Sequence, residues 1–81
     1  MMPNVFRDRG LRFFFYSDEG NPREPVHVHV KRDATQAKFW VGDEIVMAYN
    51  DKMSRRDLAM AMLIIRARKR EIMEAWHDHF R

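Results

Sequence analysis

The sequence predicts an α+β fold in which a four- to five-stranded antiparallel meander sheet packs against one long C-terminal helix. Between residues 5 and 49, short segments of alternating apolar and polar residues are separated by turn formers, a pattern typical of antiparallel strands. From residue 54 to residue 80 there is no proline or glycine, and apolar residues recur at helical spacing. Strands followed by a single helix favour one α+β domain over residues 1–81.

The second expected strand has large apolar residues on both faces. The five strands are expected at residues 5–7, 11–16, 26–31, 36–41 and 44–49. In the second of these, Leu11, Phe13 and Phe15 alternate with Phe14 and Tyr16. One helix covers only one face of a sheet, so we expect a second copy of the chain to bury the other aromatic face, which predicts a homodimer.

Turn and cap signals mark the ends of these elements. Turns are expected at residues 8–10, 32–35 and 42–43, the last as a two-residue hairpin with glycine first. Ser54 is expected to cap the helix, with Asp57 in its first turn. The apolar stripe consists of Leu58, Ala61, Met62, Ile65, Ile72, Trp76 and Phe80, widened by Leu63, Ile64 and Met73. This helix would be roughly 40 Å long, so its end is expected to project or to pair with a second protomer.

Composition places the chain among small soluble proteins. It has no cysteine, which excludes disulfides, thiolate catalysis and cysteine-ligated zinc and suits a reducing cytoplasm. No apolar run resembles a signal peptide or a membrane span, so we expect a cytoplasmic protein with no membrane partner. The net charge of +3 arises in the last third, because residues 1–53 carry equal numbers of basic and acidic side chains.

Two histidines stand two residues apart in the third expected strand. His27 and His29 alternate with three valines, so both imidazoles lie on one face and the valines on the other. The loop before them is rich in turn formers and carboxylates, and loops of this kind often carry function. The residues predicted to bind a partner together with the histidines are Asn21, Pro22, Arg23, Glu24 and Pro25.

Three interpretations of the histidine pair stay open. His27 and His29 have the spacing of two protein ligands of a zinc ion, with a third ligand from a loop carboxylate or a partner chain. They also suit general acid–base catalysis on an RNA phosphodiester, with Arg23, Lys31 or Arg32 holding the phosphate charge. Alternatively, both are polar residues on a solvated or subunit-facing strand face, and one ring anchors the proline loop by a hydrogen bond.

A basic cluster in the helix is a second candidate site. The residues Arg66, Arg68, Lys69 and Arg70 could contact a phosphate backbone of nucleic acid. The alternative is a solvated helix face in which Arg70 pairs with Glu74, four residues further on. No helix-turn-helix pattern is visible, and a helix that covers a sheet has only one face left for a groove.

Several short motifs follow one another in an order typical of one family. They are a Met-Pro-x-apolar opening, an aromatic strand, Asn-Pro followed by His-x-His-Val, and a Glu-x-x-x-x-Trp helix. In this chain the motifs are Met2–Val5, Phe13–Tyr16, Asn21-Pro22 with His27–Val30, and Glu71 with Trp76. The chain thereby resembles the bacterial family called domain of unknown function 4160, with Arg23 and Glu24 inserted after Asn-Pro.

The resemblance implies a small protein partner, and it implies no activity and no catalytic residue. Members are often encoded beside a second small uncharacterised protein, an arrangement that suggests a toxin–antitoxin-like pair. We therefore expect a non-enzymatic interaction protein, homodimeric and without a cofactor, that forms one half of such a module. The alternative is an enzyme that uses His27 and His29, either a small ribonuclease or a zinc-dependent hydrolase.

Overall fold

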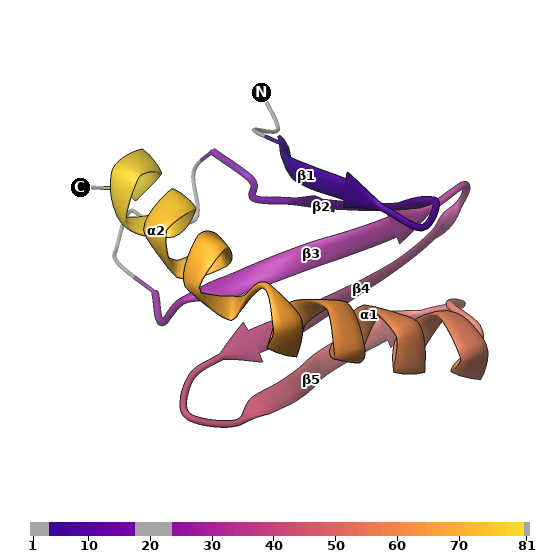
Figure 1. The fold of residues 1–81 in the computed structure, drawn as a ribbon. Helices are drawn as coiled ribbons and strands as arrows, with labels where there is room; N and C mark the ends of the chain where they lie inside the picture. The colour runs from indigo at the N-terminus through magenta and orange to yellow at the C-terminus, as the bar shows by residue number, and fades with distance from the viewer. Residues whose placement is uncertain (1–3, 18–23, 81) are drawn as a thin grey trace.

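Five strands and two helices make up the structure, a computed structural model that describes residues 4–17 and 24–80. The strands form one antiparallel sheet in the order β1-β2-β3-β4-β5, and the helices follow them in the chain (Figure 1). The strands are β1 (Asn4–Asp8), β2 (Leu11–Phe14), β3 (His27–Arg32), β4 (Thr35–Val41) and β5 (Ile45–Asp51). The helices are α1 (Arg55–Ala67) and α2 (Lys69–Phe80). The predicted α+β class and the antiparallel meander are confirmed.

The turn between β1 and β2 has a left-handed backbone. Arg9 has a φ of 51° and Gly10 a φ of 79°, the combination that a two-residue type I′ hairpin turn requires. Glycine adopts this conformation without strain, whereas an arginine there must be held by its surroundings. The turn predicted at residues 8–10 is one residue too long, because Asp8 pairs with Leu11 and belongs to β1. The sequence predicted the role of Gly10 and did not predict the conformation of Arg9.

The turn between β4 and β5 differs from its prediction. Val41 pairs with Ile45, which leaves residues 42–44 in the loop instead of the two expected. The Gly42 N–H donates to the Glu44 carbonyl oxygen (3.2 Å) and closes this loop. A two-residue turn with glycine first is wrong here, because the strand register places Glu44 outside the ladder.

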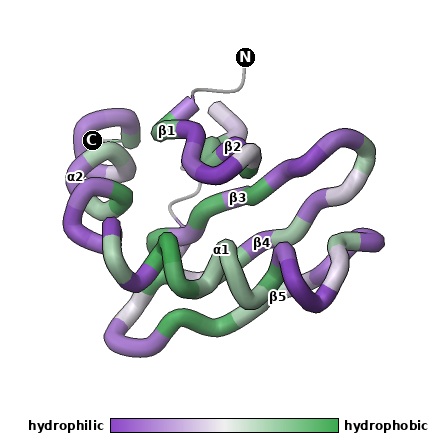
Figure 2. Tube along the Cα trace, turned by 45° about the vertical axis from the view of Figure 1, so that its right-hand side comes forward, coloured by the Kyte–Doolittle hydropathy of each residue, from purple (hydrophilic) through white to green (hydrophobic). Residues whose placement is uncertain are grey.

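The hydrophobic core lies between one face of the sheet and the two helices. Alternate strand residues point into it, among them Phe13, Val28 and Phe39, each at most 1% exposed. Ile65 of α1 and Trp76 of α2 close the core from the other side. In Figure 2 the part of α1 that lies over the strands is hydrophobic, whereas its N-terminal turn is hydrophilic. The helices therefore bury the apolar strand face and leave the beginning of α1 at the surface.

The helical region is broken at Arg68, so the prediction of one long C-terminal helix is wrong. Arg68 lies between α1 and α2 with φ −115° and ψ 26°. Its guanidinium donates to Glu71 (2.9 Å) and Asp8 (3.1 Å) and lies 3.5 Å from the centroid of the Phe6 ring. These contacts hold the side chain against β1. The break lets α2 change direction and bury Trp76 instead of projecting past the sheet (Figure 1).

The start of α1 agrees with its prediction, and one residue of the predicted stripe does not. The Ser54 hydroxyl accepts a hydrogen bond from the backbone N–H of Asp57 (3.1 Å), which confirms the cap. Ile64 is buried, whereas Leu63 is 61% exposed and does not widen the apolar stripe. Among the described residues, neither helix combines the length and the apolarity that a membrane span requires.

Candidate functional site

Strand β3 presents His27 and His29 on one face of the sheet, while Val28 and Val30 point into the core on the other. The centroids of the two imidazole rings are 5.4 Å apart, and the rings are nearly perpendicular at 88°. The two rings thus lie side by side, as the strand pattern predicts. They are not solvated, because His27 is 0% and His29 is 2% exposed within a single chain.

Phe14 and Tyr16 cover His29. Phe14 stacks on the imidazole with ring centroids 5.5 Å apart, and Tyr16 meets the same ring edge-on at 4.6 Å. Phe14 is itself fully buried. The sequence predicted that a second copy of the chain would bury this aromatic face. That reasoning is wrong for Phe14, because the neighbouring rings already cover it within one chain.

His27 joins the proline loop to the sheet. Its Nδ1–H donates to the Pro25 carbonyl oxygen (3.0 Å), the anchoring hydrogen bond that one interpretation of the pair predicts. This bond places the proton of the neutral ring on Nδ1. Trp40 of β4 and Trp76 of α2 meet the imidazole edge-on, with centroids 5.4 and 4.7 Å away. His27 therefore connects the loop, two strands and the second helix.

His29 belongs to a polar network with Gln36 and Tyr49. Its Nδ1 lies 3.4 Å from the Tyr49 hydroxyl oxygen and 3.5 Å from Gln36 Nε2. The Tyr49 hydroxyl can donate or accept, so the direction of the hydrogen bond at His29 Nδ1 depends on the tautomer of the ring. Gln36 Nε2 also donates to the Tyr16 hydroxyl (3.1 Å), which ties this network to the segment after β2. The pair is thus integrated into the fold through both rings.

A family model described as Domain of unknown function (DUF4160) matches residues 10–77, most of the chain. The chain belongs to the DUF4160 family. The matched residues include the histidine strand and Trp76, and they leave out the Met2–Val5 opening. No curated protein and no solved structure matches the chain.

Only the end of the predicted partner-binding loop can be placed in this DUF4160 chain, because residues 21–23 lie outside the described part. Glu24 forms an ion pair with Lys38 of β4 (3.6 Å), and the Lys38 ammonium lies 4.3 Å from the centroid of the Trp40 ring. Pro25 is exposed, and its carbonyl oxygen accepts the hydrogen bond from His27. Glu24 and Pro25, the described end of the loop, are therefore tied to Lys38 and His27 of the sheet.

Zinc binding has no geometric support in the described part of the DUF4160 chain. Within residues 4–17 and 24–80, no group of three His, Cys, Asp or Glu side chains could hold a metal ion. The loop carboxylates Asp18 and Glu19 lie outside these ranges, and Glu24 already has an ion pair with a lysine. The zinc site stays a prediction for which the described residues supply two ligands of the three needed.

In the part of the chain that the structure describes, the histidine pair also has no open site for acid–base catalysis. Both rings are buried, so a phosphodiester has no direct approach to them. Arg32, one of the residues predicted to hold the phosphate charge, lies at the opposite end of β3 and donates to Asp57 (2.9 Å). The structure therefore does not bring Arg32 together with His27 and His29.

The predicted basic cluster is divided by the break between the helices. Arg68 is turned toward β1, and its hydrogen bond with Glu71 raises the pKa of its guanidinium above the usual value. Arg66 and Arg70 are exposed. Arg70 lies 3.9 Å from the Glu74 carboxylate, the pairing that the solvated-face interpretation predicts. Arg68 thus has a structural role, and nucleic-acid contact by Arg66, Lys69 and Arg70 stays a prediction.

Sequence reasoning missed the exposed edge formed by β5 in the DUF4160 fold. β5 is the outermost strand, and Val46, Met47 and Tyr49 are 52%, 45% and 44% exposed. The available signal is that residues 45–50 contain no charged side chain, so apolar groups point to both faces of an edge strand.

Proposed function

We propose that this chain is a small non-enzymatic protein that acts by binding another small protein, as one half of a module resembling toxin–antitoxin pairs. The observation that carries the proposal is the surface of the β5 edge, defined by Val46, Met47 and Tyr49. Cytoplasm is the proposed location, since the sequence contains no cysteine.

The β5 edge has the properties of a strand-pairing surface. An outermost strand has one row of backbone N–H and C=O groups that no neighbouring strand of the sheet occupies. Proteins usually protect such an edge with lysine, proline or charged side chains, and residues 45–50 have none. The ladder shifts register between Lys38 and Phe39, so Met47 and Tyr49 project to opposite faces of the sheet. A partner strand laid along β5 would cover apolar groups on both faces of the sheet.

The histidine pair supports a binding role more than an enzymatic one. His27 is committed to Pro25, and His29 to Gln36 and Tyr49, so both rings stabilise the fold. A catalytic acid or base needs access to its substrate, and these rings are covered by aromatic side chains. We therefore propose neither the ribonuclease nor the zinc-dependent hydrolase.

The homodimer is proposed through the same β5 edge, as the state of the isolated protein that a partner strand would replace. Phe14 and the rings around it no longer require a second copy, whereas β5 offers a strand that two copies can share. Sedimentation velocity of the isolated protein is expected to show a dimer that Val46→Lys converts to a monomer. A wild-type monomer at high protein concentration would remove this part of the proposal.

The partner proposal rests on the gene arrangement that the family resemblance implies, and it is tested by co-expressing this chain with the product of the adjacent gene. We expect the two to elute together in size-exclusion chromatography and Val46→Lys to abolish the complex, because a charge at 52% exposure blocks strand pairing without disturbing the core. The matched control is Leu63→Lys, an equally apolar position on α1 with 61% exposure, which should leave the complex intact.

Two results would contradict the proposed function. One is a complex that survives Val46→Lys while the melting temperatures of variant and wild type agree. The other is a ribonuclease activity of the purified protein that His27→Gln removes at unchanged melting temperature.

A further inference from the structure

A cavity of about 460 Å³ lies at the end of the molecule where α1 begins, and arginines dominate its lining. Arg9 comes from the β1–β2 turn, Arg32 from the end of β3 and Arg56 from the first turn of α1. Asp57 and Met60 complete the lining. Three segments far apart in the sequence thus bring guanidinium groups to one hollow.

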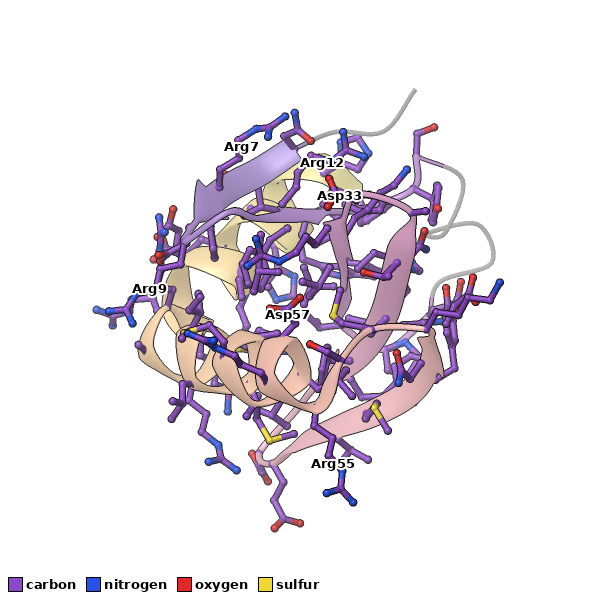
Figure 3. All side chains as sticks on the ribbon, turned by 90° about the vertical axis from the view of Figure 1, so that its right-hand side faces the viewer. Arg7, Arg9, Arg12, Asp33, Arg55 and Asp57 are labelled. Atoms are coloured by element: carbon purple, nitrogen blue, oxygen red, sulfur yellow. The ribbon has the colours of Figure 1, made fainter. Side chains whose placement is uncertain are left out.

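Arg32 forms the fixed base of this cavity. Its Nε donates to Asp57 Oδ2 (2.9 Å) and its Nη2 to the Arg9 carbonyl oxygen (3.0 Å). The third nitrogen, Nη1, lies against the turn at Gly10, where an added Cβ would be only 2.7 Å away. Asp57, the one carboxylate in the lining, is therefore already matched by Arg32. Figure 3 views this end of the molecule and shows Asp57 at its centre.

Arg9 and Arg56 contribute positive charge that the lining does not balance. Arg9 has an exposed side chain, its Nη1 lies 3.6 Å from the Met60 sulfur, and its Nε lies 3.9 Å from Asp8. The Asp8 carboxylate already accepts a closer hydrogen bond (3.1 Å) from Arg68. Arg56 has no ion pair with any residue in the described part of the chain. The cavity is thus faced by three guanidinium groups and one carboxylate, a net charge of +2.

We propose that this cavity binds a phosphate group. Guanidinium groups bind phosphate oxygens in a planar, two-point geometry, and several of them around one hollow suit a group with more charge and more oxygens than a carboxylate. Arg56 and Asp57 belong to the first turn of α1, where the helix dipole favours a negatively charged group. A free phosphate compound and the backbone of a nucleic acid share this chemistry. The site is separate from the β5 edge and does not depend on the proposed protein partner.

The test is calorimetric titration of the full chain with pyrophosphate and with a short 5′-phosphorylated single-stranded RNA, at low ionic strength where screening is weak. We expect pyrophosphate to bind and to raise the melting temperature. Arg9→Gln and Arg56→Gln should each weaken binding by roughly tenfold, the effect of losing one charged hydrogen bond. Arg32 is left intact because it holds Asp57 in place.

The matched control is Arg55→Gln, which removes the same charge from the same helix turn. Arg55 does not line the cavity, and in Figure 3 it points away from Arg9. It should weaken binding by less than about twofold, as a distant exposed charge does. RNA that binds more tightly than pyrophosphate and is lost in the same two variants would assign the phosphate to nucleic acid. Pyrophosphate binding without RNA binding would assign it to a free phosphate compound.

The proposal is overturned by either of two results. One is the absence of pyrophosphate binding by the wild-type chain at low ionic strength. The other is an equal loss of affinity in Arg55→Gln and Arg9→Gln, which would show attraction to the general charge of this surface instead of binding in the cavity.

Discussion

Gly10 and Arg32 meet at the β1–β2 turn in a contact that leaves no room for a side chain at residue 10. Gly10 has a φ of 79°, and a Cβ there would lie 2.7 Å from Arg32 Nη1. The Arg32 side chain cannot easily move away, because its other nitrogens donate hydrogen bonds to Asp57 and to the Arg9 carbonyl oxygen. The glycine therefore allows the left-handed turn and leaves space for the partly buried ion pair between Arg32 and Asp57.

Gly10→Ala is expected to destabilise the protein by about 1–3 kcal/mol, because it adds both backbone strain and a clash with Arg32. The measurement is the free energy of unfolding in urea. Gly42→Ala is the control, since Gly42 has no left-handed φ and the nearest atom to its added Cβ is 3.8 Å away. It should change the free energy by less than about 0.5 kcal/mol. Equal effects of the two substitutions would refute this account of the turn.

The break at Arg68 determines how α1 and α2 are oriented relative to each other. A continuous helix would leave the sheet, whereas the break at Arg68 turns α2 back over the core (Figure 1). The backbone hydrogen bonds continue on both sides, from the Arg68 N–H to the Ile64 carbonyl (2.9 Å) and from the Ile72 N–H to the Arg68 carbonyl (3.1 Å). The region is therefore a kinked pair of helices that one side chain fastens to β1.

Arg68→Gln is expected to lower the melting temperature, because it removes the ion pairs with Asp8 and Glu71 and the cation–π contact with Phe6. Arg70→Gln is the matched control, since its side chain is 93% exposed and its contact with Glu74 is long. The difference between the variants should shrink in high salt, where the ion pairs are screened. A melting temperature of Arg68→Gln equal to that of Arg70→Gln would contradict a fastening role.

An aromatic cluster around Trp76 holds the whole molecule together. Trp76 contacts Phe80 at 4.2 Å, His27 at 4.7 Å and Phe15 at 5.3 Å between ring centroids. It thereby joins α2 to β3 and to the segment that follows β2. Folded domains have a free energy of unfolding of only about 5–15 kcal/mol, and small domains lie toward the lower end of this range. The contacts of a single cluster are therefore a large share of the total stability.

Trp76→Ala is expected to lower the free energy of unfolding by about 3–5 kcal/mol, the usual effect of replacing a buried aromatic side chain by alanine. Urea unfolding followed by far-ultraviolet circular dichroism measures this change without relying on tryptophan fluorescence. Trp40→Ala is the comparison, because Trp40 is half-buried and should cost roughly 1–2 kcal/mol. An equal loss of unfolding free energy in Trp76→Ala and Trp40→Ala would contradict the role of the Trp76 cluster in joining the elements.

Local patterns in the sequence were sufficient for much of the fold. Alternation over a few residues predicts the strands and places His27 and His29 on one face, and the Ser54 cap depends on a residue three positions away. The anchoring of Pro25 by His27 was also among the predicted interpretations, because the two residues are close in the chain. Each of these features depends on neighbours in sequence, so one sequence contains the necessary information.

Tertiary structure alone decided the features that depend on distant residues. The bend at Arg68 requires Asp8, sixty positions earlier in the chain, and no helix-breaking residue announces it. The burial of His29 requires Tyr49 from another strand, and the arginine cavity requires three segments to meet. The sequence by itself determined which residues share a strand or helix face, since backbone periodicity fixes this. What covers each face was settled only by packing, because contacts between distant residues have no signature in a single chain.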